Sequence, residues 1–182
     1  MKTRVAERKS GINHLLESVA FGITDGVICF LGIIVGVARA TSDPTAVIIA
    51  AVVGGIADAI GNSVGFFVSQ STERAVQLVE NNGEENGHVH SEKEVWLSGI
   101  STFLATILVL IVLVLPFSFF SIWRATAVSF LIGTVLAFAL GSYVGRLGGG
   151  HPLKSAVKYA LITVFGAGVS YGVGELLNIW LH

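Results

Sequence analysis

Two aspartates stand inside otherwise apolar stretches of the sequence. Asp25 lies in the segment 18–38 and Asp58 in the segment 44–68, and neither segment contains a Lys, Arg or His to neutralise them. A carboxylate inside a membrane span costs roughly 2.5–3.5 kcal/mol on insertion scales, so such acids face a partner, a cavity or an ion path. A bound cation or a proton is the simplest source of the missing positive charge. The alternative is a structural role, in which each Asp is protonated or caps backbone groups.

Asn62 and Cys29 fall on the same helical faces as the two aspartates. Steps of three and four residues trace one small and polar stripe on each segment: Gly22, Asp25, Cys29, Gly32 and Gly36 on the first, and Gly55, Asp58, Asn62, Gly65 and Ser69 on the second. A rise of about 1.5 Å per residue places Asp25 and Asn62 roughly 10 Å from the cytoplasmic edge, and Cys29 and Asp58 at about 15 Å. If the two antiparallel segments face each other, Asp25 pairs with Asn62 and Cys29 with Asp58. These four residues are the candidate metal ligands within the membrane.

The elements that must position these residues are membrane spans. The sequence is 53% hydrophobic and only 13% charged, against roughly 25% charged in an average soluble domain. Five charge-poor segments have about the 20-residue length that a bilayer requires, namely 18–38, 44–68, 95–115, 123–145 and 155–179. We therefore expect an all-α integral membrane protein with five transmembrane helices, in which a basic segment 1–17 precedes a membrane domain 18–182.

The distribution of Lys and Arg predicts the orientation. Nine of the 11 Lys and Arg residues lie in the N-terminal segment and in the loops after spans 2 and 4, which predicts a cytoplasmic N-terminus and a C-terminus on the other side. A competing interpretation is that span 1 is a cleaved signal peptide, since residues 38–40 (ARA) resemble a cleavage site; Asp25 inside the apolar region weighs against it. A net charge of −1 argues against nucleic-acid binding, and a single cysteine rules out a disulfide framework.

Small residues four apart predict where helices touch in lipid. Within the predicted spans, five glycine pairs have this spacing, namely Gly22/Gly26, Gly32/Gly36, Gly61/Gly65, Gly141/Gly145 and Gly168/Gly172. Span 3 has no such pair, and its aliphatic run 103–115 predicts a peripheral helix that faces lipid.

Three segments resemble motifs of the vacuolar iron transporter family. Residues 19–26 (VAFGITDG) resemble the first span of that family, which carries F-G-x-x-D-G. Residues 55–62 (GIADAIGN) are similar to its G-x-x-S-M-A-x-G-E, and residues 166–174 (GAGVSYGVG) to its closing A-x-x-T-Y-x-x-G. The resemblance covers about residues 18–180.

The resemblance implies a homodimer in which spans 1 and 2 of both subunits form the core. They would line a path for Fe²⁺ or Mn²⁺, moved out of the cytoplasm in exchange for protons. No permanent cofactor and no enzyme activity is implied. The host membrane would be the plasma (inner) membrane in a prokaryote or a vacuolar-type membrane in a eukaryote. Asp25 matches the pathway aspartate of the family, whereas Asp58 replaces its methionine and Asn62 its glutamate. The methionine at position 1 is the only one in the chain, so the path offers mainly oxygen donors, which suit hard or borderline ions over copper.

The segment 69–94 is the second candidate metal site. The family's longer members insert a glutamate-lined metal-binding domain here, and this short segment holds the candidate ligands Glu73, Glu80, Glu84, Glu85, His88 and His90. It is either a reduced metal-collecting site or a solvated acidic loop.

Two functions from other classes compete with transport. In a membrane scaffold or assembly protein, the buried aspartates would only hold helices together. An intramembrane enzyme has little support, because the sequence contains no H-E-x-x-H motif, no phosphate-binding glycine loop and no nucleophile beside a base.

Overall fold

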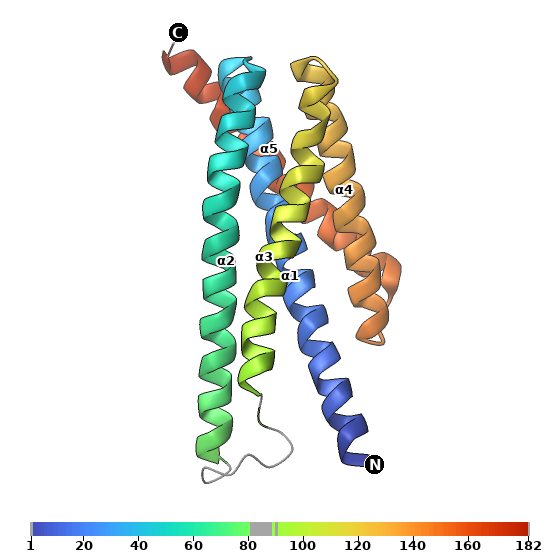
Figure 1. The fold of residues 1–182 in the computed structure, drawn as a ribbon. Helices are drawn as coiled ribbons and strands as arrows, with labels where there is room; N and C mark the ends of the chain where they lie inside the picture. The colour runs from blue at the N-terminus through green and yellow to red at the C-terminus, as the bar shows by residue number, and fades with distance from the viewer. Residues whose placement is uncertain (1, 81–88, 90, 182) are drawn as a thin grey trace.

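The computed structural model describes the backbone of residues 2–80, 89 and 91–181, and the side chains of residues 15–80, 89 and 91–180. The described chain is all-helical, as Figure 1 shows. The elements are α1 (Lys2–Thr41), α2 (Pro44–Glu80), α3 (Glu92–Val114), the short 3-10 helix η1 (Leu115–Ser118), α4 (Ile122–Leu147) and α5 (Pro152–Leu181).

Five helical segments are long and apolar enough to cross a membrane. They are Leu15–Thr41, Pro44–Glu80, Glu92–Ser118, Ile122–Leu147 and Pro152–Trp180, so the predicted all-helical fold with five spans is confirmed. The second span is longer than predicted, because α2 continues as a helix to Glu80 instead of ending near residue 68. Its 37 residues make a helix about 55 Å long, which extends well beyond a hydrocarbon core of about 30 Å.

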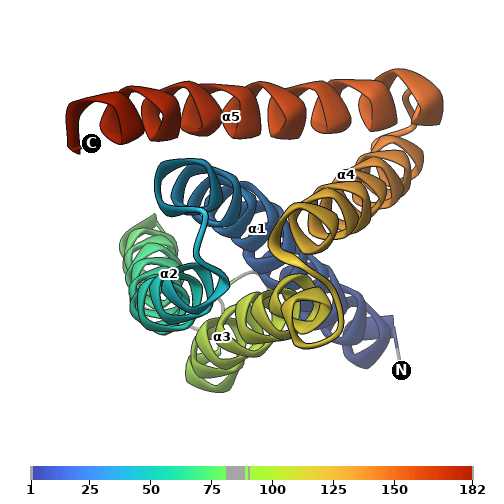
Figure 2. The ribbon, with the colours of Figure 1, turned by 90° about the horizontal axis from the view of Figure 1, so that it is seen from above.

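Helix α1 is the centre of the bundle. It packs against α2, α3, α4 and α5, and Figure 2 shows it with α5 along one side and α3 on the opposite side. Helix α5 is strongly inclined to α2 and α3: Figure 2 shows α5 side-on and those two helices more nearly end-on. Each face of α1 therefore has a different neighbour.

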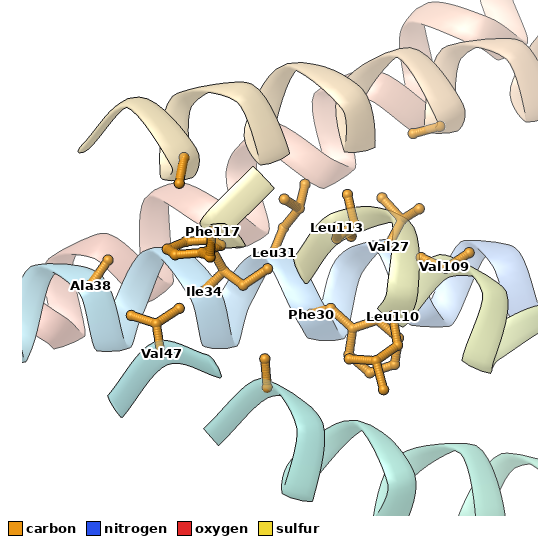
Figure 3. Close-up of a cluster of buried hydrophobic side chains, with 13 residues drawn as sticks. Val27, Phe30, Leu31, Ile34, Ala38, Val47, Val109, Leu110, Leu113 and Phe117 are labelled. Carbon is orange, nitrogen blue, oxygen red and sulfur yellow. The ribbon is translucent and has the colours of Figure 1, made fainter. Parts of the chain in front are cut away.

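The core lies where α1 meets the second half of α3 (Figure 3). Phe30, Leu31 and Ile34 of α1 are fully buried there, together with Leu113 of α3, and Phe117 of η1 packs beside them with 7% of its surface exposed. Burying side chains of this size contributes roughly 1.5–3 kcal/mol each relative to water, although lipid weakens this driving force and leaves close packing as the main term. The cluster fixes the rotation of α1, which turns Asp25 and Cys29 toward α2 and α5.

A two-residue turn joins α1 to α2. Ser42 takes a left-handed backbone conformation, with φ 52°, and the Asp43 carboxylate accepts a hydrogen bond from the Thr45 backbone N–H at 2.8 Å. Pro44 begins α2, where its missing N–H leaves no hydrogen bond unmade. The turn fixes α1 and α2 as an antiparallel pair.

Three of the five predicted small-residue pairs are helix contacts. A Cβ atom at Gly22 would lie 2.6 Å from the Thr102 carbonyl oxygen, and one at Gly32 would lie 3.0 Å from Ser170 Oγ. On α1, the pair Gly22/Gly26 contacts α3 and the pair Gly32/Gly36 contacts α5. On α4, the pair Gly141/Gly145 contacts the first two turns of α5. The other two pairs, Gly61/Gly65 and Gly168/Gly172, meet no atom of another helix within 4 Å in the described chain.

The third span is peripheral on one face only, and does not face lipid on nearly every side as expected. The outer face of α3, including Leu104 and Leu108, is exposed, but its opposite face packs against α1 and α2. Thr102 and Thr106 are fully buried, and each donates to a carbonyl of its own helix at 2.9 Å with a second carbonyl, on α1, at 3.3 Å. Hydroxyl side chains permit close helix approach much as glycine does, so a search for glycine pairs alone misses this face.

Candidate ion-binding site

The two intramembrane aspartates meet at one amide group between α1 and α2. Asn62 Nδ2 donates to Asp25 Oδ2 at 2.7 Å and to Asp58 Oδ2 at 3.1 Å. The pairing of Asp25 with Asn62, predicted from depth, is confirmed. Asp58 is one turn before Asn62 on α2, so the same amide reaches both carboxylates.

Cys29 completes this group of side chains. Its side chain interacts with that of Asp58, which agrees with the pairing predicted for the deeper level. We use the name "polar seam" for Asp25, Cys29, Asp58 and Asn62. All four side chains are half-buried, so the polar seam is neither fully enclosed by the subunit nor fully exposed.

The polar seam has an excess of negative charge. Among the described side chains, the ion pairs are Arg39 with Glu175 and Arg74 with Glu92, and neither involves Asp25 or Asp58. Two carboxylates that share one amide repel each other unless a proton or a cation lies between them. The arrangement therefore suits the binding of a positive charge.

One subunit alone offers few strong ligands. No group of three or more His, Cys, Asp and Glu side chains in the described ranges is arranged to hold a metal ion. The polar seam supplies two carboxylates, one thiol and one amide oxygen. Further ligands would have to come from water or from a second chain.

A groove opens beside the polar seam, between α1 and α5. Its volume is about 450 Å³, and it extends from Cys29 along α1 to Ala40, with Ser170 and Gly174 on the α5 side. The lining is mostly apolar. Because Cys29 belongs to both features, the groove adjoins the polar seam within the span.

The predicted stripes do not form one continuous face. On α1, Gly22 contacts α3 and Gly32 and Gly36 contact α5, while Asp25 turns toward α2. The physical reason is the central position of α1, whose small residues serve contacts with several neighbours. The interacting part of the two stripes is the polar seam itself.

The candidate ligands of segment 69–94 are separate from the polar seam. Glu73 and Glu80 lie on the extension of α2, and Glu73 Oε1 accepts a hydrogen bond from Gln77 Nε2 at 3.3 Å. Glu73 is 11 residues beyond Asn62, or about 16 Å along the helix. Glu84, Glu85, His88 and His90 lie outside the described residues.

Sequence reasoning missed a charged contact at the other end of α1. Arg39 forms an ion pair with Glu175 of α5, and its guanidinium lies 5.6 Å from the centre of the Tyr171 ring. One turn further along α5, Asn178 Nδ2 donates to the Ala40 carbonyl at 2.8 Å. The sequence contained a signal for this contact: Arg39 and Glu175 both lie near the C-terminal ends of spans 1 and 5, which cross the membrane in the same direction, so a depth count places them at the same level.

Five apolar helices with a carboxylate pair between the first two define a multi-pass integral membrane protein with a polar site inside the bilayer. The sequence matches the VIT family over residues 16–94 and 83–175, which is most of the chain. The chain therefore belongs to the VIT family, as its motifs indicate.

Two relatives illustrate the breadth of the match. An uncharacterized protein of Methanocaldococcus jannaschii is 27% identical over 160 residues, covering 82% of this chain and 81% of that protein. The VIT-like transporter 1b of Glycine max is 24% identical over 178 residues, covering 90% of this chain and 76% of its own length. Both alignments cover most of the chain.

Proposed function

We propose that this protein is a membrane transporter for a divalent metal ion, with Fe²⁺ or Mn²⁺ as its cargo. The observation that carries the proposal is the amide-bridged pair of Asp25 and Asp58 inside the membrane span, with which no described cation forms an ion pair. Membership of the VIT family and the likeness to a protein named a transporter support the same class of function.

The amide of Asn62 is the adaptable part of the site. It directs its N–H groups at both carboxylates, and among the described residues its Oδ1 accepts no hydrogen bond. Rotation of the amide by half a turn would direct Oδ1 toward the same space. A cation would then meet oxygen atoms from Asp25, Asp58 and Asn62, a donor set that suits Mn²⁺ or Fe²⁺ over copper.

Release of the ion would leave two carboxylates facing each other. Protonation relieves their repulsion in a medium of low dielectric constant. Metal and protons would therefore occupy the polar seam in turn, which is the requirement for proton-coupled exchange. The family resemblance implies that the metal moves out of the cytoplasm, and the distribution of Lys and Arg favours a cytoplasmic N-terminus.

A second copy would complete the path. The polar seam is half-exposed and short of ligands, and the adjoining groove of about 450 Å³ lies along the same stretch of α1. Gly61 and Gly65 also leave α2 open to close approach by another helix. A homodimer that joins the α1 and α2 helices of two subunits would bring four aspartates to one path.

Flux through liposomes tests the roles of the two aspartates. The protein is reconstituted with a metal-quenched dye inside the vesicles, and Mn²⁺ influx is compared for wild type, Asp25→Asn and Asp58→Asn. Both variants should lower the flux by about tenfold or more, because each removes a charged ligand. Asp43→Asn is the matched control, since Asp43 lies in the exposed turn and Asn caps a helix equally well. Flux unchanged in both polar-seam variants would refute the assignment.

Cys29 provides an independent measurement, because it is the only cysteine of the chain. Mn²⁺ should slow its alkylation by a membrane-permeant maleimide in wild type and not in Asp25→Asn. In a scaffold, by contrast, Asp→Asn changes would weaken helix association while metal would leave the alkylation rate unchanged. The two readouts together separate transport from a purely structural role.

A further inference from the structure

We propose that the hairpin formed by α4 and α5 binds an anionic phospholipid. Lys154 and Lys158 would contact the headgroup, and a cavity between α1, α4 and α5 would hold part of one acyl chain. The inference is independent of the polar seam, and it rests on charge and on the shape of the cavity.

The charge at this end of the hairpin is uncompensated. Lys154 and Lys158 are both exposed and lie one turn apart at the start of α5, and Arg146 lies in the last turn of α4. No Asp or Glu occurs from residue 122 to residue 174, and no described acid forms an ion pair with either lysine. A group of cations beside membrane helices attracts anionic headgroups.

The N-terminal turn of α5, held close to α4, is a second source of positive potential at this end of the hairpin. A Cβ atom at Gly141 would lie 2.8 Å from the Ser155 carbonyl oxygen, and one at Gly145 would lie 2.8 Å from Ser155 Oγ. The first turn of α5, which contains no acidic residue, is thus held tightly against α4. Helix N-termini carry unpaired N–H groups and favour anions, and here Lys154 lies in that first turn and Lys158 in the next one.

The adjoining cavity is apolar and has Lys158 in its wall. Its volume is about 310 Å³, and Ile23, Ile28, Ala137, Leu140 and Ile162 supply most of its lining. The wall also contains Tyr159, and its two threonine hydroxyl groups are engaged within their own helices, because Thr24 donates to Ala20 O at 2.8 Å and Thr163 to Tyr159 O at 3.1 Å. The cavity therefore offers apolar surface next to one ammonium group.

This combination selects the class of ligand. Inorganic phosphate would use the lysines and leave the apolar cavity unfilled, whereas a neutral lipid would leave the lysines unpaired. A diacyl lipid with a negative headgroup satisfies both, because its chain fills the apolar volume while its phosphate meets Lys154 and Lys158. The lysine charge also disfavours the apolar face of another copy of the chain as occupant.

Native mass spectrometry of the purified protein tests the proposal. The protein in detergent is mixed with equal amounts of phosphatidylglycerol and phosphatidylcholine, and the bound lipid is counted. Phosphatidylglycerol should bind preferentially, and Lys158→Gln should lower that preference about fivefold. Lys158→Arg should retain it. Arg124→Gln is the matched control, because Arg124 is an exposed cation on α4 outside the hairpin end and outside the cavity lining.

A second variant tests the cavity separately from the charge. Ile162 lies in the lining and is 46% exposed, so Ile162→Trp can fill the cavity from its open side. It should lower the binding of both lipids, with the unfolding temperature unchanged. Equal binding of the two lipids by wild type would overturn the proposal. Full displacement of phosphatidylglycerol by glycerol 3-phosphate would also overturn it, because it indicates a phosphate site only. So would an Ile162→Trp variant that leaves lipid binding unchanged; a change in oligomer mass in that variant would indicate that a second copy of the chain occupies the cavity.

Discussion

Asn62 donates hydrogen bonds to both acids of the polar seam, and the geometry of the site depends on its amide group. Counting depth along two antiparallel helices predicts that Asp25 and Asn62 meet, and the hydrogen bond of 2.7 Å agrees. The additional bond to Asp58 could not be predicted in the same way, because a depth count gives the level of a side chain and not its rotamer. The metal role of these residues stays a prediction.

Replacement of Asn62 tests its structural contribution. Asn62→Leu keeps the approximate volume and removes the donor shared by two carboxylates. We expect the free energy of unfolding of the subunit to fall by about 1–2 kcal/mol. Hydrogen bonds to charged groups contribute somewhat more than this in water-soluble proteins, and the values measured in membranes are smaller. Reversible unfolding in detergent mixtures, followed by tryptophan fluorescence, measures this loss. Unchanged stability would show that the two hydrogen bonds make no net contribution.

At the scale of elements, the crossing of α1 and α5 depends on the absence of side chains. Gly36 and Gly174 face each other so closely that a Cβ atom at Gly174 would collide with the Gly36 carbonyl oxygen. The ion pair of Arg39 with Glu175 and the hydrogen bond from Asn178 hold the same crossing together. The sequence indicated that Gly32 and Gly36 form a contact. Their partner helix could not be predicted, since small-residue spacing carries no information about which helix approaches.

Gly174→Ala should destabilise the subunit. The added methyl group meets backbone and the Cβ atom of Arg39 at 3.1 Å, neither of which is a flexible chain end, so the crossing must shift. We expect a loss of about 1–3 kcal/mol, the usual range for overpacking. Gly168→Ala on the same helix is the matched control, because its methyl group meets open space in the subunit. It should be neutral or stabilise by up to about 1 kcal/mol through helix propensity. Equal effects of the two variants in unfolding experiments on monomeric protein would contradict this explanation.

Helix α3 shows a limit of pattern reading at the same scale. Its aliphatic residues from 103 to 115 suggested a helix surrounded by lipid, and half of that surface is indeed exposed. The other half contains Ser98, Thr102 and Thr106, which recur every four residues and are fully buried. The hydroxyl groups of the two threonines lie against backbone carbonyls of α1. Hydropathy alone does not distinguish such a face from one that faces lipid, because threonine is neither strongly apolar nor strongly polar.

For the whole molecule, the five spans and the helical fold were predictable because the lengths of apolar segments are set by the bilayer. The continuation of α2 to Glu80 was not predictable, because a helix of 37 residues passes from lipid to water without a break. The orientation of the termini stays a prediction from the distribution of Lys and Arg.

Labelling of single cysteines tests that orientation. In a Cys29→Ser background, Ser121→Cys should react with a membrane-impermeant maleimide added outside intact cells. Ser121 is exposed and makes no side-chain capping hydrogen bond, so the substitution is mild. Glu80→Cys, at the exposed end of α2, should react only after the membrane is permeabilised. The reverse pattern would place the N-terminus outside the cytoplasm and would invert the proposed direction of transport.

The two-residue link between α1 and α2 bears on how the chain is made. A ribosome delivers α1 first, and alone it would expose the Asp25 carboxylate to lipid with no donor nearby. A link this short lets the two helices enter the translocon as a unit, so that Asn62 reaches Asp25 before either is released into the bilayer. We therefore expect the hairpin, rather than the single helix, to be the smallest piece of this protein that a cell can insert.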